Sequence, residues 1–256
     1  MTHHNDNRTG QRYAVLDIET LNRVEAYQSY ARLDPDPAPL RYPFRSTVAA
    51  ALLTFSVVDG IFEFGHLESW AGDDEAALLK GLFSRLHMLP DHTLVTYGGL
   101  WMDLPVLRIG AARHHLRLPR QLIANARQHR EWLHLDLAKE FQSGSHIHMS
   151  EVAVALDLPV KFADRASMVP MLLQTGKLER LRNIPIADVL STSLLLQAQL
   201  ETHGDLASAR AAQITTLREA RQRRPEARFA DYLRRVEQRL AREAMAEAEA
   251  FVASAA

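Results

Sequence analysis

The chain has 256 residues, of which 47% are hydrophobic and 24% are charged, and its formal net charge at pH 7 is −1. This size and composition are typical of one large domain, and the balanced charge excludes a basic field over the whole surface. A nucleic-acid partner would therefore need a local basic patch or bound metal ions. Because the sequence contains no cysteine, disulfides, thiolate zinc sites, iron–sulfur clusters and thiol nucleophiles are excluded.

The N-terminal segment is polar, and residues 1–11 are predicted to form a disordered leader. This segment lacks the apolar stretch of a secretory signal, and the most apolar run, residues 47–58, is too short to span a bilayer. We therefore expect a cytoplasmic protein with no membrane partner.

The following residues predict alternating strands and helices, which is typical of a mixed α/β domain. Residues 13–20 are an apolar run with an acidic end, as in a buried strand, and residues 22–43 are expected to be a loop. Asp59-Gly60 favours the tight turn of a β-hairpin between residues 46–58 and residues 61–66. Later elements are expected at residues 73–86 (helix, capped by Asp73 or Asp74), 93–97 (strand), 103–116 (helix) and 132–136 (strand or helix start).

The second half of the chain is predicted to be mainly helical. We expect a helix from Ser150 to residue 156, irregular structure after Pro159, and a long helix over residues 186–200. We assign residues 12–203 to the α/β domain and residues 204–256 to a helical C-terminal extension.

The C-terminal extension carries an apolar stripe and a basic stretch. Pro225 interrupts the helical pattern, and apolar residues then recur at steps of four and three from Phe229 to Phe251. This stripe predicts packing on the main domain or against a second copy of the chain, as a homodimer. Arginines between residues 221 and 239 alternate with acidic residues, so they form either a solvated helix face or a phosphate-binding surface.

Two acidic residues end the first predicted strand. Asp17 and Glu19 lie two residues apart, so in a strand both carboxylates project from the same face. At a separation of about 4 Å two such charges repel by roughly 4 kcal/mol at an effective dielectric near 20. Magnesium or manganese would offset this repulsion, since both prefer hard oxygen ligands, and solvated acids at a strand end are the alternative.

Two further acids lie at positions where an interaction partner would stabilise their carboxylates. Asp103 follows a strand and a glycine loop at the start of a predicted helix, where it is either a helix cap or a metal ligand. Asp188 borders the apolar face of the predicted helix over residues 186–200. A carboxylate next to an apolar face needs a compensating partner, and a metal ion is one.

The four acids lie in three motifs along the chain. The first is Tyr-Ala-Val-Leu-Asp-Ile-Glu-Thr at residues 13–20, and the second is Val-Thr-Tyr-Gly-Gly-Leu-Trp-Met-Asp-Leu-Pro-Val-Leu at residues 95–107. The third is Asn-Ile-Pro-Ile-Ala-Asp-Val at residues 183–189. In this order the three motifs resemble those of the DEDD superfamily of 3′→5′ exonucleases. Segments similar to the branch related to the exonuclease domain of family-B DNA polymerases lie between them, at residues 135–137, 150–161 and 174–177.

The resemblance covers about residues 12–200. It implies an α/β fold of the ribonuclease H-like type, a mixed β-sheet flanked by helices, and a 3′→5′ exonuclease acting on single-stranded nucleic acid, with DNA favoured over RNA. It also implies two divalent cations, Mg²⁺ or Mn²⁺, held by the acids Asp17, Glu19, Asp103 and Asp188.

In such enzymes one ion activates the attacking water and the other stabilises the leaving 3′ oxygen. Thr20 and Trp101 are the expected substrate-binding residues. For Trp101, stacking on a terminal base and packing in the core are both open.

The chain departs from the family pattern next to the last acid. The polymerase-related branch carries a tyrosine four residues before that acid, where this chain has Ile184. A sister branch carries a histidine five residues before it, where this chain has Asn183. Because isoleucine has no hydrogen-bonding group, Ile184 is expected to supply only packing. The departure keeps a second function open, namely a nuclease-derived nucleic-acid-binding or scaffold protein with weak or no catalysis.

Overall fold

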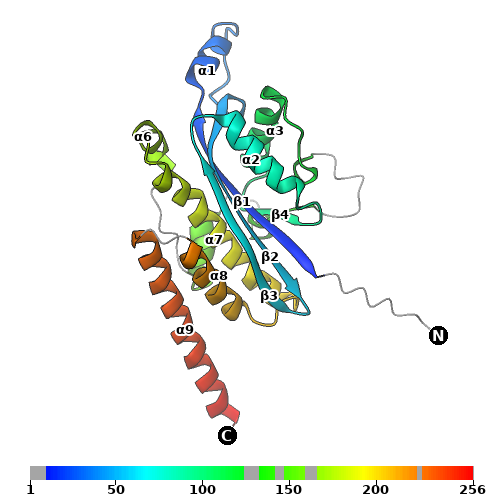
Figure 1. The fold of residues 1–256 in the computed structure, drawn as a ribbon, viewed down its shortest axis with the longest axis vertical. Coiled ribbons are helices and arrows are strands. Elements are labelled where there is room, and N and C mark those ends of the chain that lie inside the picture. Colours follow the sequence, from blue (N-terminus) through cyan, green and yellow to red (C-terminus); the bar gives the residue numbers. More distant parts are fainter. Residues whose placement is uncertain (1–9, 124–132, 142–146, 159–165, 224–226, 256) are drawn as a thin grey trace, which may run out of the picture.

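The computed structural model of the protein describes residues 10–123, 133–141, 147–158, 166–223 and 227–255. Its strands are β1 (Gln11–Asn22), β2 (Arg45–Val58), β3 (Ile61–Ala71), β4 (Thr93–Thr96) and β5 (His134–Asp136). They form one sheet in the order β3-β2-β1-β4-β5 (Figure 1). The pairs β1–β2 and β2–β3 are antiparallel, whereas β4 pairs parallel with both β1 and β5. The predicted mixed sheet is confirmed.

The predicted β-hairpin is also confirmed. Asp59 and Gly60 connect β2 to β3 with positive φ angles of 51° and 77°, a turn conformation that matches the right-handed twist of the paired strands. β3 continues to Ala71, beyond its predicted end at His66, and pairs with β2 over this length. β2 is therefore paired on both sides and buried along most of its length.

Helices cover both faces of the sheet (Figure 1). One face carries α2 and α3 and the other carries α7 and α8, with the bounds Glu75–His87, Asp103–Arg113, Leu178–Thr202 and Ala209–Arg223, respectively. Side chains alternate between the two faces along a strand. Odd-numbered β1 residues such as Val15 therefore pack toward α7, and even-numbered residues such as Leu16 pack toward α2 and α3.

Residues 22–43 contain a helix, so the prediction of a loop was wrong. α1 (Val24–Ala31) projects beyond the end of the sheet (Figure 1). The rings of Tyr27 and Tyr30 each pack on Phe44, with ring centroids 5.4 Å apart in both pairs. The sequence did not indicate this helix because its N-cap residue makes no side-chain capping bond and its packing partner, Phe44, lies beyond the segment.

Of two helix caps predicted from the sequence, the cap of α2 is confirmed and the cap of α5 (Met149–Ala155) is wrong by two residues. Asp74 caps α2 as predicted, accepting a hydrogen bond from a first-turn N–H at 3.0 Å. α5 begins one residue before Ser150, so Ser150 is not its cap. The cap position is His148, whose backbone N–H donates to the Glu151 carboxylate at 2.7 Å.

The long helix predicted over residues 186–200 begins earlier, and a short helix precedes it. α6 (Val169–Gln174) lies in a stretch expected to be irregular, and α7 begins at Leu178. Pro185 concealed this extension, because proline usually marks a helix boundary. Here the first turns of α7 are held by packing, since Leu181 is buried in a cluster with residues of α6 and β2.

Two predicted segments fall partly outside the described residues. Of the predicted leader, residues 1–9 lie outside them, and Gln11 already belongs to β1. Of the segment 132–136, Trp132 lies outside them, and the described end forms β5, which leads directly into α4 (Leu137–Phe141). The strand alternative for this segment is therefore the correct one.

The two C-terminal helices, α8 and α9 (Ala227–Ala255), share a core with α7 and β1. α9 lies along α8, and Leu233, Val236 and Leu240 are buried in the same core as α7 and β1. The predicted packing of the apolar stripe is confirmed for these residues, whereas the side chains of Phe229 and Phe251 are not among those described. In the described part of the chain, no helix is long and apolar enough to cross a lipid bilayer.

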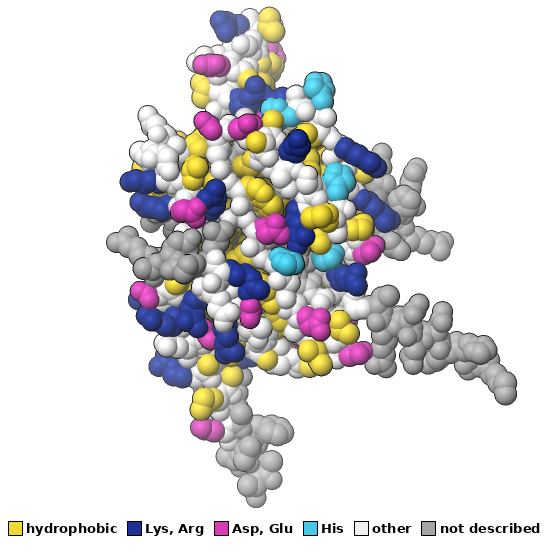
Figure 2. All heavy atoms as spheres, viewed as in Figure 1, with side chains coloured by type: hydrophobic (Ala, Val, Ile, Leu, Met, Phe, Trp, Pro, Cys, Tyr) yellow, Lys and Arg dark blue, Asp and Glu magenta, His cyan; other side chains and the backbone are white. Residues whose placement is uncertain are grey.

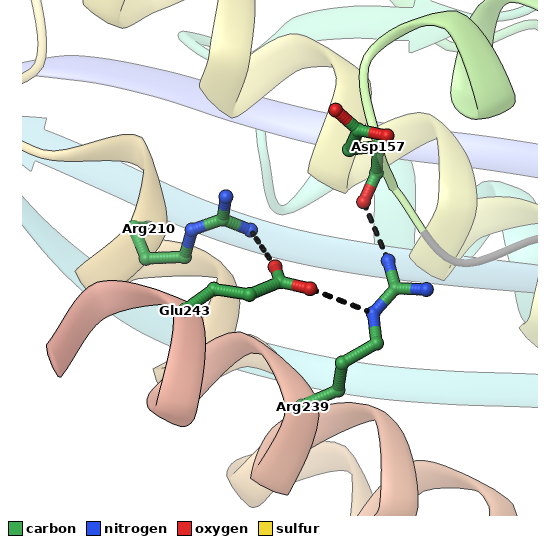
Figure 3. A pocket seen from close by; sticks show the side chains of 4 residues that line it. All are labelled: Asp157, Arg210, Arg239 and Glu243. Atoms are coloured by element: carbon green, nitrogen blue, oxygen red, sulfur yellow. Dashed lines mark hydrogen bonds and ion pairs between the residues drawn. The ribbon is translucent and has the colours of Figure 1, made fainter. Parts of the chain in front are cut away.

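Arginines of α8 and α9 form ion pairs within and between the two helices. Glu243 pairs with Arg239 at 3.2 Å within α9 and with Arg210 of α8 at 3.3 Å (Figure 3). Arg239 also donates to the backbone carbonyl oxygen of Asp157 at 2.5 Å. Acidic and basic side chains intermingle over this part of the surface (Figure 2). These contacts favour a solvated, ion-paired helix face over a phosphate-binding surface.

We expect Leu240→Ala to lower the free energy of unfolding by about 2–5 kcal/mol, because this side chain is fully buried in the core beneath α9. Met245 of the same helix is 64% exposed. Met245→Ala is therefore the control and should change stability by less than about 0.5 kcal/mol. Urea denaturation measures both variants, and equal effects would show that α9 is not part of the folded core.

Candidate metal centre

The acidic end of β1 lies on the face of the sheet that α7 covers. Asp17 and Glu19 continue the odd-numbered row of β1, in which Val15 packs in the core beneath α7. Their partners across β2 are Ala51 and Ala49, respectively. Because alanine side chains are small, α7 can approach the sheet closely next to the two carboxylates, and it contacts both β1 and β2.

α7 brings a third carboxylate to this position. Asp188 lies between core residues of α7 and is only 7% exposed. One carboxylate oxygen from each of Asp17, Glu19 and Asp188 lies within 4.8 Å of the other two. Such a set of hard oxygen donors fits magnesium or manganese, and a cation would offset the repulsion among the three charges.

Asp103 reaches the same end of the sheet from the neighbouring strand. β4 runs parallel to β1, with Val95 paired to Val15, so the loop after β4 is level with Asp17 and Glu19. Asp103 is the first residue of α3 and is buried. Its charge interacts with those of Glu19 and Asp188, although among the described residues it is not part of the group of oxygens within 4.8 Å.

The surroundings of Asp103 strongly favour its protonated form. Burial and then the charges of Glu19, Asp136 and Asp188 raise the pKa of Asp103 to about 8. Asp103 would therefore hold a proton at neutral pH in the absence of a cation. The four acids thus lie toward one end of the sheet, three of them with oxygens within 4.8 Å of one another, and their roles as ligands are taken up below.

Asp136 was not among the site residues predicted from the sequence, yet it fixes the loop that precedes Asp103. It ends β5, next to Thr96 of the parallel strand β4. Its carboxylate accepts hydrogen bonds from the N–H groups of Gly98 at 2.6 Å and Leu100 at 2.9 Å. One sequence signal could have indicated Asp136, namely an acid at the carboxyl end of a predicted strand. The carboxyl ends of parallel strands lie at the same edge of a sheet, so such an acid is expected near other residues at strand ends.

The two predicted substrate-binding residues lie in different environments. Thr20 follows Glu19 at an irregularity in the β1–β2 pairing, and its hydroxyl oxygen accepts from Arg45 at 3.2 Å. Trp101 is 74% exposed, which excludes the core-packing alternative. The ammonium group of Lys139 lies 5.7 Å from the centroid of the Trp101 ring.

Ile184 and Asn183, the residues at the positions where the resemblance led us to expect a tyrosine or a histidine, both lie on α7. Ile184 is fully buried in a cluster that includes Val48 and Leu181, so it supplies packing as expected. Asn183 is half-buried. A tyrosine at position 184 would have to fit into this apolar cluster, and large insertions into a packed core usually cost about 1–3 kcal/mol.

The chain belongs to the family of predicted 3′–5′ exonucleases related to the exonuclease domain of PolB, which its sequence matches over residues 39–236. This membership confirms the resemblance to the polymerase-related branch inferred from the motifs. The match begins after β1, so Asp17 and Glu19 lie outside it, and it extends through α8 into α9. No curated protein matches the sequence.

Solved structures are similar to this chain at low sequence identity. The family B DNA polymerase from the hyperthermophilic archaeon Pyrobaculum calidifontis is 16% identical, with a TM-score of 0.50, over 81% of this chain and 29% of the polymerase chain. Exonuclease I of E. coli in complex with ssDNA is 14% identical, with a TM-score of 0.42, over 75% of this chain and 45% of that chain. The chain therefore spans less than half the length of either protein. The predicted ribonuclease H-like fold, a mixed sheet flanked by helices, is confirmed.

The raised pKa of Asp103 predicts a pH-dependent stability of the metal-free protein. The native carboxyl holds its proton up to about pH 8, whereas an unfolded one ionises near pH 4. The stabilisation from the protonated group is therefore complete below about pH 4 and is lost as the pH rises through about 8. The free energy of unfolding should fall over this range by at most about 1.4 kcal/mol per pH unit from this group.

Asp103→Asn should remove this contribution, because the amide does not titrate. Urea denaturation of both proteins in the presence of a chelator, between about pH 5 and about pH 9, measures the difference in stability at each pH. A difference that stays constant over this range would contradict the raised pKa.

Proposed function

We propose that this protein is a metal-dependent 3′→5′ exonuclease that hydrolyses phosphodiester bonds at single-stranded nucleic-acid 3′ ends. The observation that carries the proposal is the group of carboxylate oxygens from Asp17, Glu19 and Asp188 within 4.8 Å of one another, in a chain that belongs to an exonuclease family. DNA is the preferred substrate over RNA in this proposal, because the family is related to the exonuclease domain of a DNA polymerase.

The proposed ligands are Asp17, Glu19, Asp103 and Asp188, which offer the hard oxygens that Mg²⁺ and Mn²⁺ prefer. Two such ions, when bound, lower the pKa of an attacking water and stabilise a leaving 3′ oxygen. Asp103 would ionise next to a cation, because a nearby positive charge favours the carboxylate form. Its raised pKa in the metal-free protein is thus compatible with a ligand role.

Other side chains would position the substrate around this centre. Asp136 holds the loop over residues 98–100 and thereby sets the place of Trp101 and Asp103. The exposed indole of Trp101 offers a surface on which the base of a terminal nucleotide can stack. Thr20, next to Glu19, is the second proposed substrate contact.

A nucleic-acid-binding or scaffold protein with weak or no catalysis is the second candidate. One observation favours it, namely that Ile184 packs in the core and offers no hydroxyl at the position where the related branch carries a tyrosine. The two candidates differ in product formation, because only the enzyme shortens its substrate in the presence of a divalent ion.

A hydrolysis assay with single-stranded DNA and RNA of the same sequence, labelled at the 5′ end, tests the proposal. We expect shortening from the 3′ end with Mg²⁺ or Mn²⁺ and none with a chelator. Asp17→Asn and Asp188→Asn should each lower the rate by about 10²–10⁴-fold, the range typical of a lost catalytic group. Asp231→Asn is the control, since Asp231 lies on α9 in an exposed ion pair with Arg234 and should not affect the rate.

Thermal denaturation provides an independent measure of the metal centre. Divalent ions should raise the melting temperature of the wild type more than that of Asp188→Asn, because they bind the folded state. Stabilisation by the metal without any product would favour the binding-protein candidate. Equal activity of the variants, together with no stabilisation by the metal, would contradict the metal centre itself.

A further inference from the structure

Trp101 and Lys139 form an exposed pair, although they come from separate segments. Trp101 lies on the loop between β4 and α3, two residues before Asp103, and Lys139 lies on α4, directly after β5. The Lys139 ammonium is 5.7 Å from the centroid of the indole, within the range of a cation–π interaction. Both residues are exposed, and Trp101 is 74% exposed.

One buried carboxylate ties the two segments together. Oδ1 of Asp136 accepts from the N–H of Gly98 at 2.6 Å and from the N–H of Ala138 at 3.1 Å, and Oδ2 accepts from the N–H of Leu100 at 2.9 Å. The first and third bonds fix the segment that carries Trp101, and the second fixes the start of the helix that carries Lys139. The buried carboxylate of Asp136 therefore fixes both segments that carry the pair.

The backbone of the Trp101 loop is itself constrained. Gly98 has a φ of +76°, which glycine adopts readily and other residues rarely adopt. A Cβ at Gly99 would lie 2.6 Å from the Cβ of Thr96, so this position also requires glycine. The backbone that carries the exposed indole of Trp101 is thus held in one conformation.

The charge of the site makes a nearby cation important for binding nucleic acid. Phosphodiesters are anionic, and the carboxylates of Asp17, Glu19, Asp103 and Asp188 would repel them when ionised. Lys139 places a positive charge beside the ring of Trp101, which lies two residues before Asp103 in the chain. An ammonium has three donors, so it can contact the ring and a phosphate oxygen together. Because Trp101 is 74% exposed, its indole also offers surface to a nucleobase.

We propose that Trp101 and Lys139 together bind one nucleotide of a single-stranded substrate. The base stacks on the indole, and the Lys139 ammonium pairs with a backbone phosphate. This inference rests on the proposed function, since it places the nucleotide next to the candidate metal centre. It assigns to Lys139 a substrate contact that the sequence motifs did not indicate.

Fluorescence anisotropy of a fluorescein-labelled single-stranded oligothymidine tests this inference. The measurement is made in chelator, so that it depends on binding and not on hydrolysis, and at several salt concentrations. Lys139→Ala should weaken binding several-fold and reduce the slope of log K against log salt concentration by about 0.7, the value for one phosphate contact of a single strand. Lys139→Arg should retain the wild-type slope, because it keeps the charge.

Two further variants separate the roles of the pair. Trp101→Ala should weaken binding at every salt concentration without changing the slope, because stacking releases no counterions. Lys80→Ala is the matched control, since Lys80 is an exposed lysine on α2 and should leave both affinity and slope unchanged.

The outcomes distinguish this inference from the proposed function. If the wild type binds the oligonucleotide and Lys139→Ala keeps the full salt slope, the inference is wrong, and the hydrolysis assay still decides the exonuclease proposal. If the wild type binds no oligonucleotide in chelator, the nucleotide contact by Trp101 and Lys139 is contradicted, and the hydrolysis assay with Mg²⁺ or Mn²⁺ still decides the single-stranded substrate. The metal-induced rise in melting temperature would then be the separate test of the metal centre.

Discussion

Repulsion among carboxylates at one end of the sheet is the interaction that the rest of this structure has to accommodate. Asp17, Glu19 and Asp188 bring oxygens within 4.8 Å of one another, and the pKa of the nearby Asp103 is raised to about 8. Placing like charges together at low exposure is unfavourable unless a cation or a proton compensates. The fold must therefore hold these groups through packing elsewhere, and their repulsion becomes a driving force for cation binding.

The packing that holds the acids is visible on both sides of β1. This strand is paired with β2 on one side and β4 on the other, and its apolar residues enter separate cores on the two faces of the sheet. α7 is anchored at its start by Leu181 and Ile184 and along its length by the core that it shares with α8 and α9. Asp188 therefore cannot move away from Asp17 and Glu19 without disrupting two clusters of buried side chains.

The loop that carries Trp101 is held by a different kind of interaction. Asp136 uses hydrogen bonds to backbone N–H groups to shape the turn before Asp103. Its negative charge also contributes to the raised pKa of Asp103, so the same group that orders the loop adds to the demand for a cation. Asp136 thus both orders the loop and makes the site more negative.

Local patterns in the sequence were sufficient for the features that depend on local chemistry. Alternation placed Asp17 and Glu19 on one face of a strand, and Asp59-Gly60 marked the hairpin. The helix α1 was missed because Phe44, which packs on its tyrosines, lies outside the helix.

Features that depend on strand pairing could not be predicted in the same way. The role of Asp136 requires that β5 lies next to β4, and the contact between Lys139 and Trp101 requires both strands and their loops. The alanines opposite the two acids of β1 let α7 approach the sheet, and this role can be recognised only when the position of α7 is known. The candidate acids were therefore predictable, whereas the groups that position them were not.

The central claim is that the carboxylates of β1 and α7 bind a divalent cation. An anomalous-scattering map from a crystal soaked in Mn²⁺ tests it most directly. The account predicts a manganese peak within about 2–2.5 Å of carboxylate oxygens of Asp17 and Asp188, the distance range for oxygen ligands of such ions. Manganese bound only elsewhere on the protein, or no peak at these carboxylates in a saturated crystal, would contradict it.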